Sequence, residues 1–271
     1  MPIAPRDDRG GIAVSNLSKT YRSPWPFWRK PGVEALADVS FRVGPGAISA
    51  VLGANGAGKT TLLKILATLL RPTAGSVSLD GADAARSAAQ CRARLGYCGA
   101  VERSFYHRLS GRENLWFFGR LQNLPRSRLR LRIEECLTLF RLSDKGDQRF
   151  AQYSTGMQQL LGLARALLHS PSILLLDEPT RSLDPYNAEQ YRVLLREVLA
   201  RQLNMTVLLA THNFAEAEQI ADRVIFLHQG RVKREGLTRE LLSRDGELRS
   251  IFFRLLGEES LESETRPGVR R

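Results

Sequence analysis

Two kinds of hydrophobic segment alternate along this chain of 271 residues. Short apolar runs with few polar residues predict strands that are buried on both faces, and they occupy residues 47–52, 173–176 and 206–210. Segments in which apolar residues recur three and four positions apart predict helices at residues 62–67, 154–169, 185–201 and 214–221. Strands that alternate with helices in this way indicate an α/β fold with a parallel sheet.

Shorter segments complete this pattern. Further strands are predicted at residues 12–17, 37–43, 76–79, 95–98, 224–227 and 231–233. The strands nearest the N-terminus are expected to form an antiparallel β subdomain. Two helices, 111–122 and 127–140, are separated at Pro125, so the helical stretch from about 100 to 155 predicts a subdomain inserted into the sheet domain. Residues 258–271 are polar, and we expect this tail to be mobile.

One predicted loop, residues 23–32, is rich in proline and large aromatic residues. Proline excludes it from a central strand. Its aromatic side chains could fold back onto the domain or form a contact surface, and the sequence leaves both interpretations open.

The chain is strongly basic, with a formal net charge of +12. Arginine supplies most of the positive charge and is spread along the chain, so a solvated basic surface is the first interpretation. Binding to nucleic acid or attraction to anionic lipid are the alternatives. One set of arginines is expected to coat the exposed face of the second predicted helix of the insertion: Arg126, Arg128, Arg130 and Arg132.

Cysteine usage and hydropathy restrict the class of protein. The hydrophobic content of 43% is ample for a core. Cys91, Cys98 and Cys136 show no Cys-x-x-Cys spacing, which favours a reducing compartment and argues against a structural zinc site. No apolar run reaches the roughly 18 residues of a membrane span, and residues 1–10 lack the apolar segment of a secretory signal. We therefore expect a soluble or peripheral protein.

The clearest motif is Gly-x4-Gly-Lys-Thr at residues 53–61, between a predicted strand and a predicted helix. This spacing defines a P-loop, whose backbone N–H groups and helix N-terminus bind phosphate. We expect Lys59 to reach the β- and γ-phosphates and the Thr60 hydroxyl to bind Mg²⁺. A glycine-rich turn without a ligand is the alternative. The residues expected to contact the nucleotide are Gly53, Asn55, Gly56, Gly58, Lys59, Thr60 and Thr61.

Two acidic residues follow the apolar strand 173–176. Asp177 fits the second protein ligand of Mg²⁺, and Glu178 fits the base that orients or deprotonates the attacking water. His212 follows the strand 206–210, at the edge where parallel sheets bind ligands. A neutral imidazole there could donate a hydrogen bond to the γ-phosphate, although a single histidine is more often structural.

These motifs together resemble the nucleotide-binding subunit of an ATP-binding cassette (ABC) transporter from about residue 12 to 240. The resemblance rests on order and spacing, and its motifs are residues 53–61, 153–159, 175–180, 182–184 and 211–212. The segment 153–159, Tyr-Ser-Thr-Gly-Met-Gln-Gln, is a variant of the signature loop of that family and is its most specific motif.

The resemblance implies further roles. Tyr21 would stack on adenine, and two copies would meet head to tail so that each closes the ATP site of the other. Ser154 would cap a helix and Gly156 would allow close approach, which presents a second helix N-terminus to the γ-phosphate. Asp184 would lie at the dimer seam.

The sequence departs from the family pattern in several places. Thr155 and Met157 replace a glycine and a glutamine of the signature, a form that resembles exporters with small two-part permeases, and Leu160 replaces a commonly basic residue. The glutamine expected after the strand 95–98 is missing, and Val101 cannot perform its role. We hypothesise that Glu102 replaces it as a ligand of metal or water.

We therefore expect a P-loop NTPase (RecA-like) core with an N-terminal antiparallel β subdomain and an inserted helical subdomain. Residues 12–240 would be the ATP-binding domain, and 241–271 a C-terminal helix and polar tail. The expected activity is Mg²⁺-dependent ATP hydrolysis that drives export. A non-transport ABC ATPase that acts on ribosomes or DNA, and a regulatory module that binds ATP without turnover, are the alternatives.

The expected partners follow from the same resemblance. They are a second copy of the chain and a separate transmembrane permease, with no nucleic acid, at the cytoplasmic face of the cell membrane. We expect the permease to dock around residues 104–114, with Phe105, Tyr106 and Trp116 as candidate contacts that could equally belong to the core.

Overall fold

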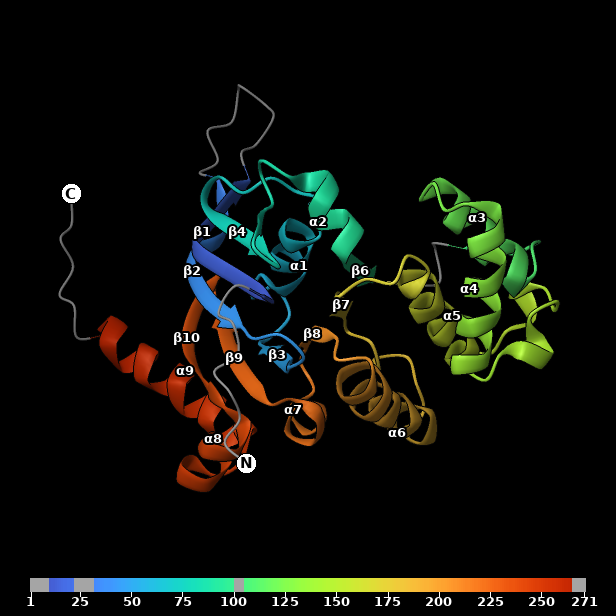
Figure 1. The fold of residues 1–271 in the computed structure, drawn as a ribbon. Coiled ribbons are helices and arrows are strands. Elements are labelled where there is room, and N and C mark those ends of the chain that lie inside the picture. Colours follow the sequence, from blue (N-terminus) through green and yellow to red (C-terminus); the bar gives the residue numbers. More distant parts are fainter. Residues whose placement is uncertain (1–9, 22–31, 100–104, 265–271) are drawn as a thin grey trace, which may run out of the picture.

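The structure is a computed structural model that describes residues 10–21, 32–99 and 105–264, with side chains as far as residue 257. Two sheets and a group of helices make up the described part (Figure 1). Glu102, Val101 and almost all of the aromatic loop lie outside the described residues.

The central sheet has six strands. Their order is β10 (Arg231–Leu237), β9 (Arg223–His228), β3 (Ile48–Leu52), β8 (Thr206–Thr211), β7 (Ile173–Asp177) and β6 (Leu95–Cys98). All neighbouring pairs from β9 to β6 are parallel, and β10 pairs antiparallel with β9. The predicted parallel sheet is confirmed, and the carboxyl ends of β3, β7 and β8 meet at one edge.

The N-terminal sheet is antiparallel, as predicted. Its order is β2 (Val33–Val43), β1 (Ile12–Tyr21), β4 (Ala74–Leu79) and β5 (Ala82–Asp83). β1 is longer than predicted because irregular pairing around Asn16, where φ is 49°, lets it continue past residue 17. Asp80 and Gly81, with φ of 46° and 79°, join β4 to β5, as a tight hairpin turn requires.

Two hydrophobic cores cover the two faces of the central sheet. On β3, Val51 packs toward α1 (Lys59–Leu66) and the antiparallel sheet, whereas Ala50 and Leu52 pack toward the helices on the other face. Burial on both faces explains why the parallel strands are continuous apolar runs rather than alternating ones.

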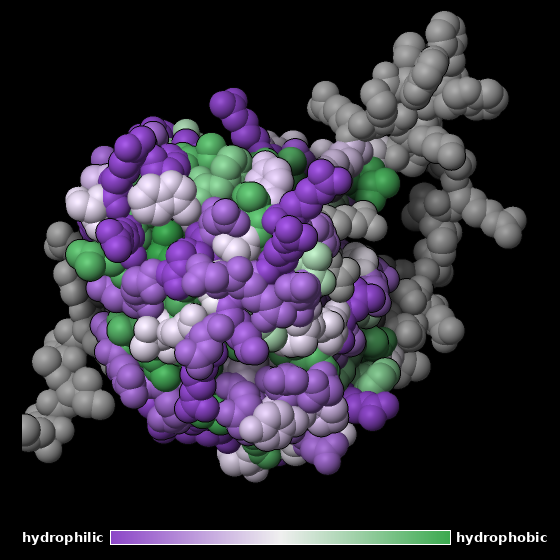
Figure 2. Space-filling model, turned by 90° about the vertical axis from the view of Figure 1, so that its right-hand side faces the viewer, coloured by the Kyte–Doolittle hydropathy of each residue, from purple (hydrophilic) through white to green (hydrophobic). Residues whose placement is uncertain are grey.

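The helical stretch predicted from about 100 to 155 contains α3 (Gly111–Leu121) and α4 (Arg126–Leu139), and α5 (Thr155–Leu167) packs against both. A capping box formed by Ser110 and Glu113 starts α3. These helices lie together to one side of the central sheet (Figure 1). The face of the molecule on that side is mostly hydrophilic (Figure 2).

The arginines of α4 divide into two kinds. Arg126, Arg128 and Arg130 are exposed, as predicted. Arg132 instead donates hydrogen bonds to the carbonyl oxygens of Leu167 and Leu168, at 2.9 and 3.4 Å, where α5 ends. A cation is favoured at a helix C-terminus, so Arg132 joins α4 to the end of α5.

The remaining helices differ in part from the predictions. Their bounds are α2 (Ala88–Arg94), the 3-10 helices η1 (Ser143–Lys145) and η2 (Phe150–Gln152), α6 (Pro185–Val193), the π-helix η3 (Leu194–Gln202), α7 (Phe214–Ile220), α8 (Thr238–Asp245) and α9 (Leu248–Glu264). α9 continues to Glu264, so it includes the first part of the tail that was predicted from residue 258. Ile251 and Phe252 are buried and anchor this helix. Among the described residues, no helix is long and apolar enough to cross a membrane.

Candidate functional site

The P-loop joins β3 to α1, and its glycines are needed for its shape. Gly56 and Gly58 have φ of 82° and 106°, a conformation that other residues rarely adopt. A Cβ atom at Gly53 would lie 2.3 Å from the carbonyl oxygen of Leu227 on β9. No side chain caps the first turn of α1. The backbone N–H groups at the start of α1 can therefore donate hydrogen bonds to an anion.

Lys59, the first residue of α1, is almost fully buried. Its Nζ donates hydrogen bonds to the carbonyl oxygens of Gly53 and Ala54 at 2.7 and 3.2 Å, and lies 3.5 Å from Oε1 of Glu178. Oxygen atoms of the loop and of Glu178 thus surround the ammonium group.

Asp177 ends β7 and fits a metal ligand. Its Oδ1 is buried and has no hydrogen-bond partner among the described residues. Burial raises the pKa of this carboxyl, and the charge of Glu178 raises it further, while the Thr60 hydroxyl, Lys59 and Lys64 lower it. A hard cation beside Thr60 would satisfy the unpaired oxygen. Mg²⁺ needs only one or two carboxylates together with substrate phosphates.

Glu178 and His212 form a direct pair. Oε2 of Glu178 lies 2.7 Å from Nδ1 of His212. The backbone N–H of Glu178 donates to the carbonyl oxygen of Ala210 at 2.8 Å, and its φ is 50°, which is unusual for a residue other than glycine. Glu178 and His212 were predicted as site residues at the ends of two different strands. The parallel pairing of β7 with β8 brings their side chains into contact.

Tyr21 also lies at this site. It ends β1, its side chain is 42% exposed, and its hydroxyl lies 3.4 Å from Oγ1 of Thr61. Nζ of Lys19 lies 5.4 Å from the centroid of its ring. The ring is therefore accessible beside α1, where a flat base could stack on it. Asn55 is exposed in the loop itself.

The signature residues lie elsewhere. Oγ of Ser154 accepts a hydrogen bond from the backbone N–H of Met157 at 3.3 Å and caps α5, as predicted. Gly156 lies against the side chain of Asn187, which a Cβ atom would approach to 3.3 Å. Asp184 caps α6 and binds Asn187. The described contacts of Ser154 and Gly156 include no P-loop residue, so one copy does not bring the two motifs together.

Sequence reasoning overlooked two residues next to the Glu178–His212 pair. Glu216 on α7 is buried, and its Oε1 accepts a hydrogen bond from Oγ1 of Thr180 at 2.7 Å. The sequence offered one signal for Glu216. It is an acidic residue on the buried face of the predicted helix 214–221, next to Ala217. A cavity of about 430 Å³ borders this cluster.

Comparisons with known proteins identify the family. The model of the ABC transporter family matches residues 36–181. The ABC transporter ATP-binding protein NatA of Bacillus subtilis is 36% identical over 244 residues, which cover 89% of this chain and 96% of that protein. The daunorubicin resistance ATP-binding protein DrrA3 of Streptomyces coeruleorubidus is 42% identical over 213 residues, which cover 79% and 66%.

Solved structures agree with this similarity. A dimeric post-hydrolysis state of the ATP-binding cassette MJ0796, bound to ADP and Pi, matches with a TM-score of 0.72 and 28% identity, covering 84% of this chain and 99% of that chain. The ATP-binding subunit of another ABC transporter matches with a TM-score of 0.73 and 27% identity, covering 91% and 99%. The predicted family and fold are confirmed. The chain belongs to the ABC transporter family, as an ATP-binding subunit that hydrolyses ATP in support of transport.

Proposed function

We propose that two copies of this chain bind Mg²⁺·ATP between them and drive export through a separate membrane permease. The observation that carries this proposal is the convergence of Lys59, Asp177, Glu178 and His212 at the P-loop. The name of the resistance protein DrrA3 and the exporter-like form of the signature support export over import.

The geometry suggests how these residues act on ATP. Lys59 would exchange the loop carbonyls and Glu178 for the β- and γ-phosphate oxygens. Glu178, released from Lys59, would accept the proton of the attacking water, while its bond to His212 keeps the carboxylate in place. Thr60 and Asp177 would hold Mg²⁺, which neutralises phosphate charge.

The proposed dimer explains the position of the signature. Ser154 and Gly156 lie at the start of α5, far along the chain from the P-loop, and Gly156 lies against Asn187, which is hydrogen-bonded to Asp184. A second copy placed head to tail would bring its α5 N-terminus to the γ-phosphate bound by the first. The dimeric structures of MJ0796 support the pairing of two copies.

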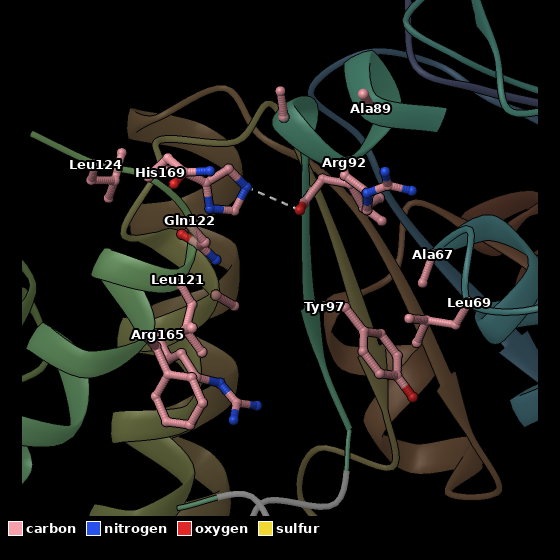
Figure 3. A pocket seen from close by; sticks show the side chains of 15 residues that line it. Ala67, Leu69, Ala89, Arg92, Tyr97, Leu121, Gln122, Leu124, Arg165 and His169 are labelled. Carbon is pink, nitrogen blue, oxygen red and sulfur yellow. Dashed lines mark hydrogen bonds between the residues drawn. The ribbon is translucent and has the colours of Figure 1, made fainter. Parts of the chain in front are cut away.

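A cavity of about 740 Å³ between the sheet domain and the helical subdomain offers a docking site for the permease. Figure 3 shows Leu121 and Arg165 on one wall and Leu69 and Tyr97 on the opposite wall. Its described lining contains Arg92 and other basic side chains but no acidic residue. We therefore propose that a short amphipathic segment with an acidic residue inserts here.

The predicted docking segment adjoins this cavity. Phe105 is buried, stacks on Phe150 with ring centroids 4.8 Å apart, and packs under the guanidinium of Arg165. Tyr106 and Trp116 are exposed. Phe105 is therefore a core residue, while Tyr106 and Trp116 remain candidates for the permease contact, at the inner face of the cell membrane.

The proposal is tested with Glu178→Gln. This change keeps the shape of the side chain but removes the base, so we expect ATP hydrolysis to slow by about 100- to 10,000-fold. ATP binding should persist, and size-exclusion chromatography with saturating ATP should show a trapped dimer. Glu189→Gln, on the exposed side of α6, is the matched control. An unchanged ATPase rate, or a monomer at saturating ATP, would contradict the proposed mechanism.

A further inference from the structure

Glu216 is a buried acidic residue whose role the proposed mechanism does not explain. It lies on α7, is 1% exposed, and accepts a hydrogen bond from the Thr180 hydroxyl at 2.7 Å. Its backbone N–H donates to Oδ1 of Asn213 at 3.2 Å, and the N–H of Asn213 donates to Oγ1 of Thr211 at 3.0 Å. Glu216 is thus held from two sides.

The contacts of Glu216 with Thr180 and Asn213 join the loop that follows β7 to the loop that follows β8. Thr180 lies two residues after Glu178, and Asn213 directly follows His212. The link through Glu216 therefore runs parallel to the direct 2.7 Å contact between Glu178 and His212. Within the described residues, it connects the segment after β7 with the start of α7 through the buried Thr180–Glu216 hydrogen bond and the partly buried hydrogen bonds of Asn213.

The backbone of the first loop needs such a link. Glu178 has a φ of 50°, and a non-glycine residue keeps this conformation only where its surroundings impose it. On one side, the N–H of Glu178 is fixed to Ala210 on β8. On the other side, the side chain of Thr180 is fixed by Glu216. Hydrogen bonds thus hold the chain at Glu178 and two residues after it.

Stability alone does not account for an acid at this position. Removing a carboxylate from water costs free energy that an apolar residue of similar volume would not cost. Burial raises the pKa of Glu216, against the lowering effect of the Thr180 and Thr211 hydroxyls and of Arg192. What the carboxyl group supplies and an apolar residue could not is the acceptor that fixes the Thr180 hydroxyl at 2.7 Å.

We propose that Glu216 is a positioning residue, which acts through Thr180 to hold Glu178 against His212 in the geometry for attack of water on ATP. This inference rests on the roles proposed above for Glu178 and His212. It assigns Glu216 and Thr180 to the hydrolysis step and not to nucleotide binding.

The test compares steady-state ATPase kinetics of full-length variants. Thr180→Val keeps the shape and removes the hydroxyl, whereas Thr180→Ser keeps the hydroxyl. We expect Thr180→Val and Glu216→Ala to lower kcat by about 10- to 100-fold, because a misplacement of about 1 Å can have that effect. KM for ATP should stay within about threefold, and Thr180→Ser should retain most of the wild-type kcat.

Glu218→Gln is the matched control, since Glu218 is also an acid of α7 but accepts a hydrogen bond from the N–H of Leu248 at 2.8 Å. We expect its kcat to equal that of the wild type. A thermal melt of every variant identifies samples that lose activity by unfolding, and Thr180→Val provides the result if Glu216→Ala does not fold.

Glu178→Gln, measured in parallel, separates the two proposals. If Glu178→Gln is slow but Thr180→Val keeps the wild-type kcat, the positioning role is refuted and the mechanism stands. If Thr180→Val and Thr180→Ser lose the same activity, or if KM rises in proportion as kcat falls, the role of Glu216 is structural. If Glu178→Gln hydrolyses ATP normally, both proposals fail.

Discussion

Asn114 offers a prediction whose size follows from its contacts. It lies on α3 and is 0% exposed. Its Oδ1 accepts from the N–H of Tyr106 at 2.9 Å, and its Nδ2 donates to the carbonyl oxygens of Tyr106 and Ser110 at 3.0 and 2.9 Å, with a longer contact of 3.4 Å to Leu109. One side chain thus organises residues 106–110, next to the proposed docking cavity.

Asn114→Ala removes all of these hydrogen bonds. At about 1 kcal/mol for each short bond, the free energy of unfolding should fall by about 3 kcal/mol. The thermal midpoint should fall by about 6–12 °C, since 1 kcal/mol shifts it by about 2–4 °C in chains of this size class. Affinity for ATP should not change, because Asn114 has no described contact with the P-loop.

Chemical denaturation gives the change in stability, and hydrogen exchange shows where it arises. We expect faster exchange at the N–H of Tyr106 and in the first turn of α3, with β3 and α1 unaffected until global unfolding. Ser127→Ala, at an exposed position of α4, should change stability by less than about 0.5 kcal/mol. A loss below 1 kcal/mol in Asn114→Ala, or exchange that accelerates equally throughout the chain, would refute the reasoning.

Three further predictions concern the P-loop and the buried thiols. Lys59→Met should weaken ATP binding by about 10- to 100-fold, because a hydrogen bond to a charged group contributes about 1.5–3 kcal/mol; a fluorescent ATP analogue measures this, and wild-type affinity would exclude the phosphate role. Gly53→Ala should lower stability by about 1–3 kcal/mol, since its Cβ would lie 2.3 Å from the carbonyl oxygen of Leu227; an unaltered denaturation midpoint would contradict the need for glycine. Burial raises the pKa of Cys98 and Cys136 to about 11 and also raises the pKa of Cys91. A thiol reagent at pH 8 should therefore label these cysteines only after denaturant is added. Rapid labelling of the native chain would contradict this prediction.

The local sequence determined most of the fold and the chemical parts of the site. The strands of the central sheet could be predicted because burial on both faces leaves an unbroken apolar run, as in residues 173–176. The helix starts at Ser154 and in the P-loop could be predicted because caps and glycines act within a few residues. Lys59, Asp177 and Glu178 belong to short motifs whose residue types and spacing alone predict a phosphate and Mg²⁺ site.

The tertiary structure decided how these parts meet. Only the pairing of β7 with β8 places Glu178 on His212, and only the packing of α7 buries Glu216 against Thr180. The position of Phe105 in the core likewise depends on its stacking with the distant Phe150, and α9 is anchored by the buried Ile251 and Phe252. Residue periodicity reports which face of an element is buried, but not which element covers it. Contacts between segments far apart in the chain therefore had to come from the structure.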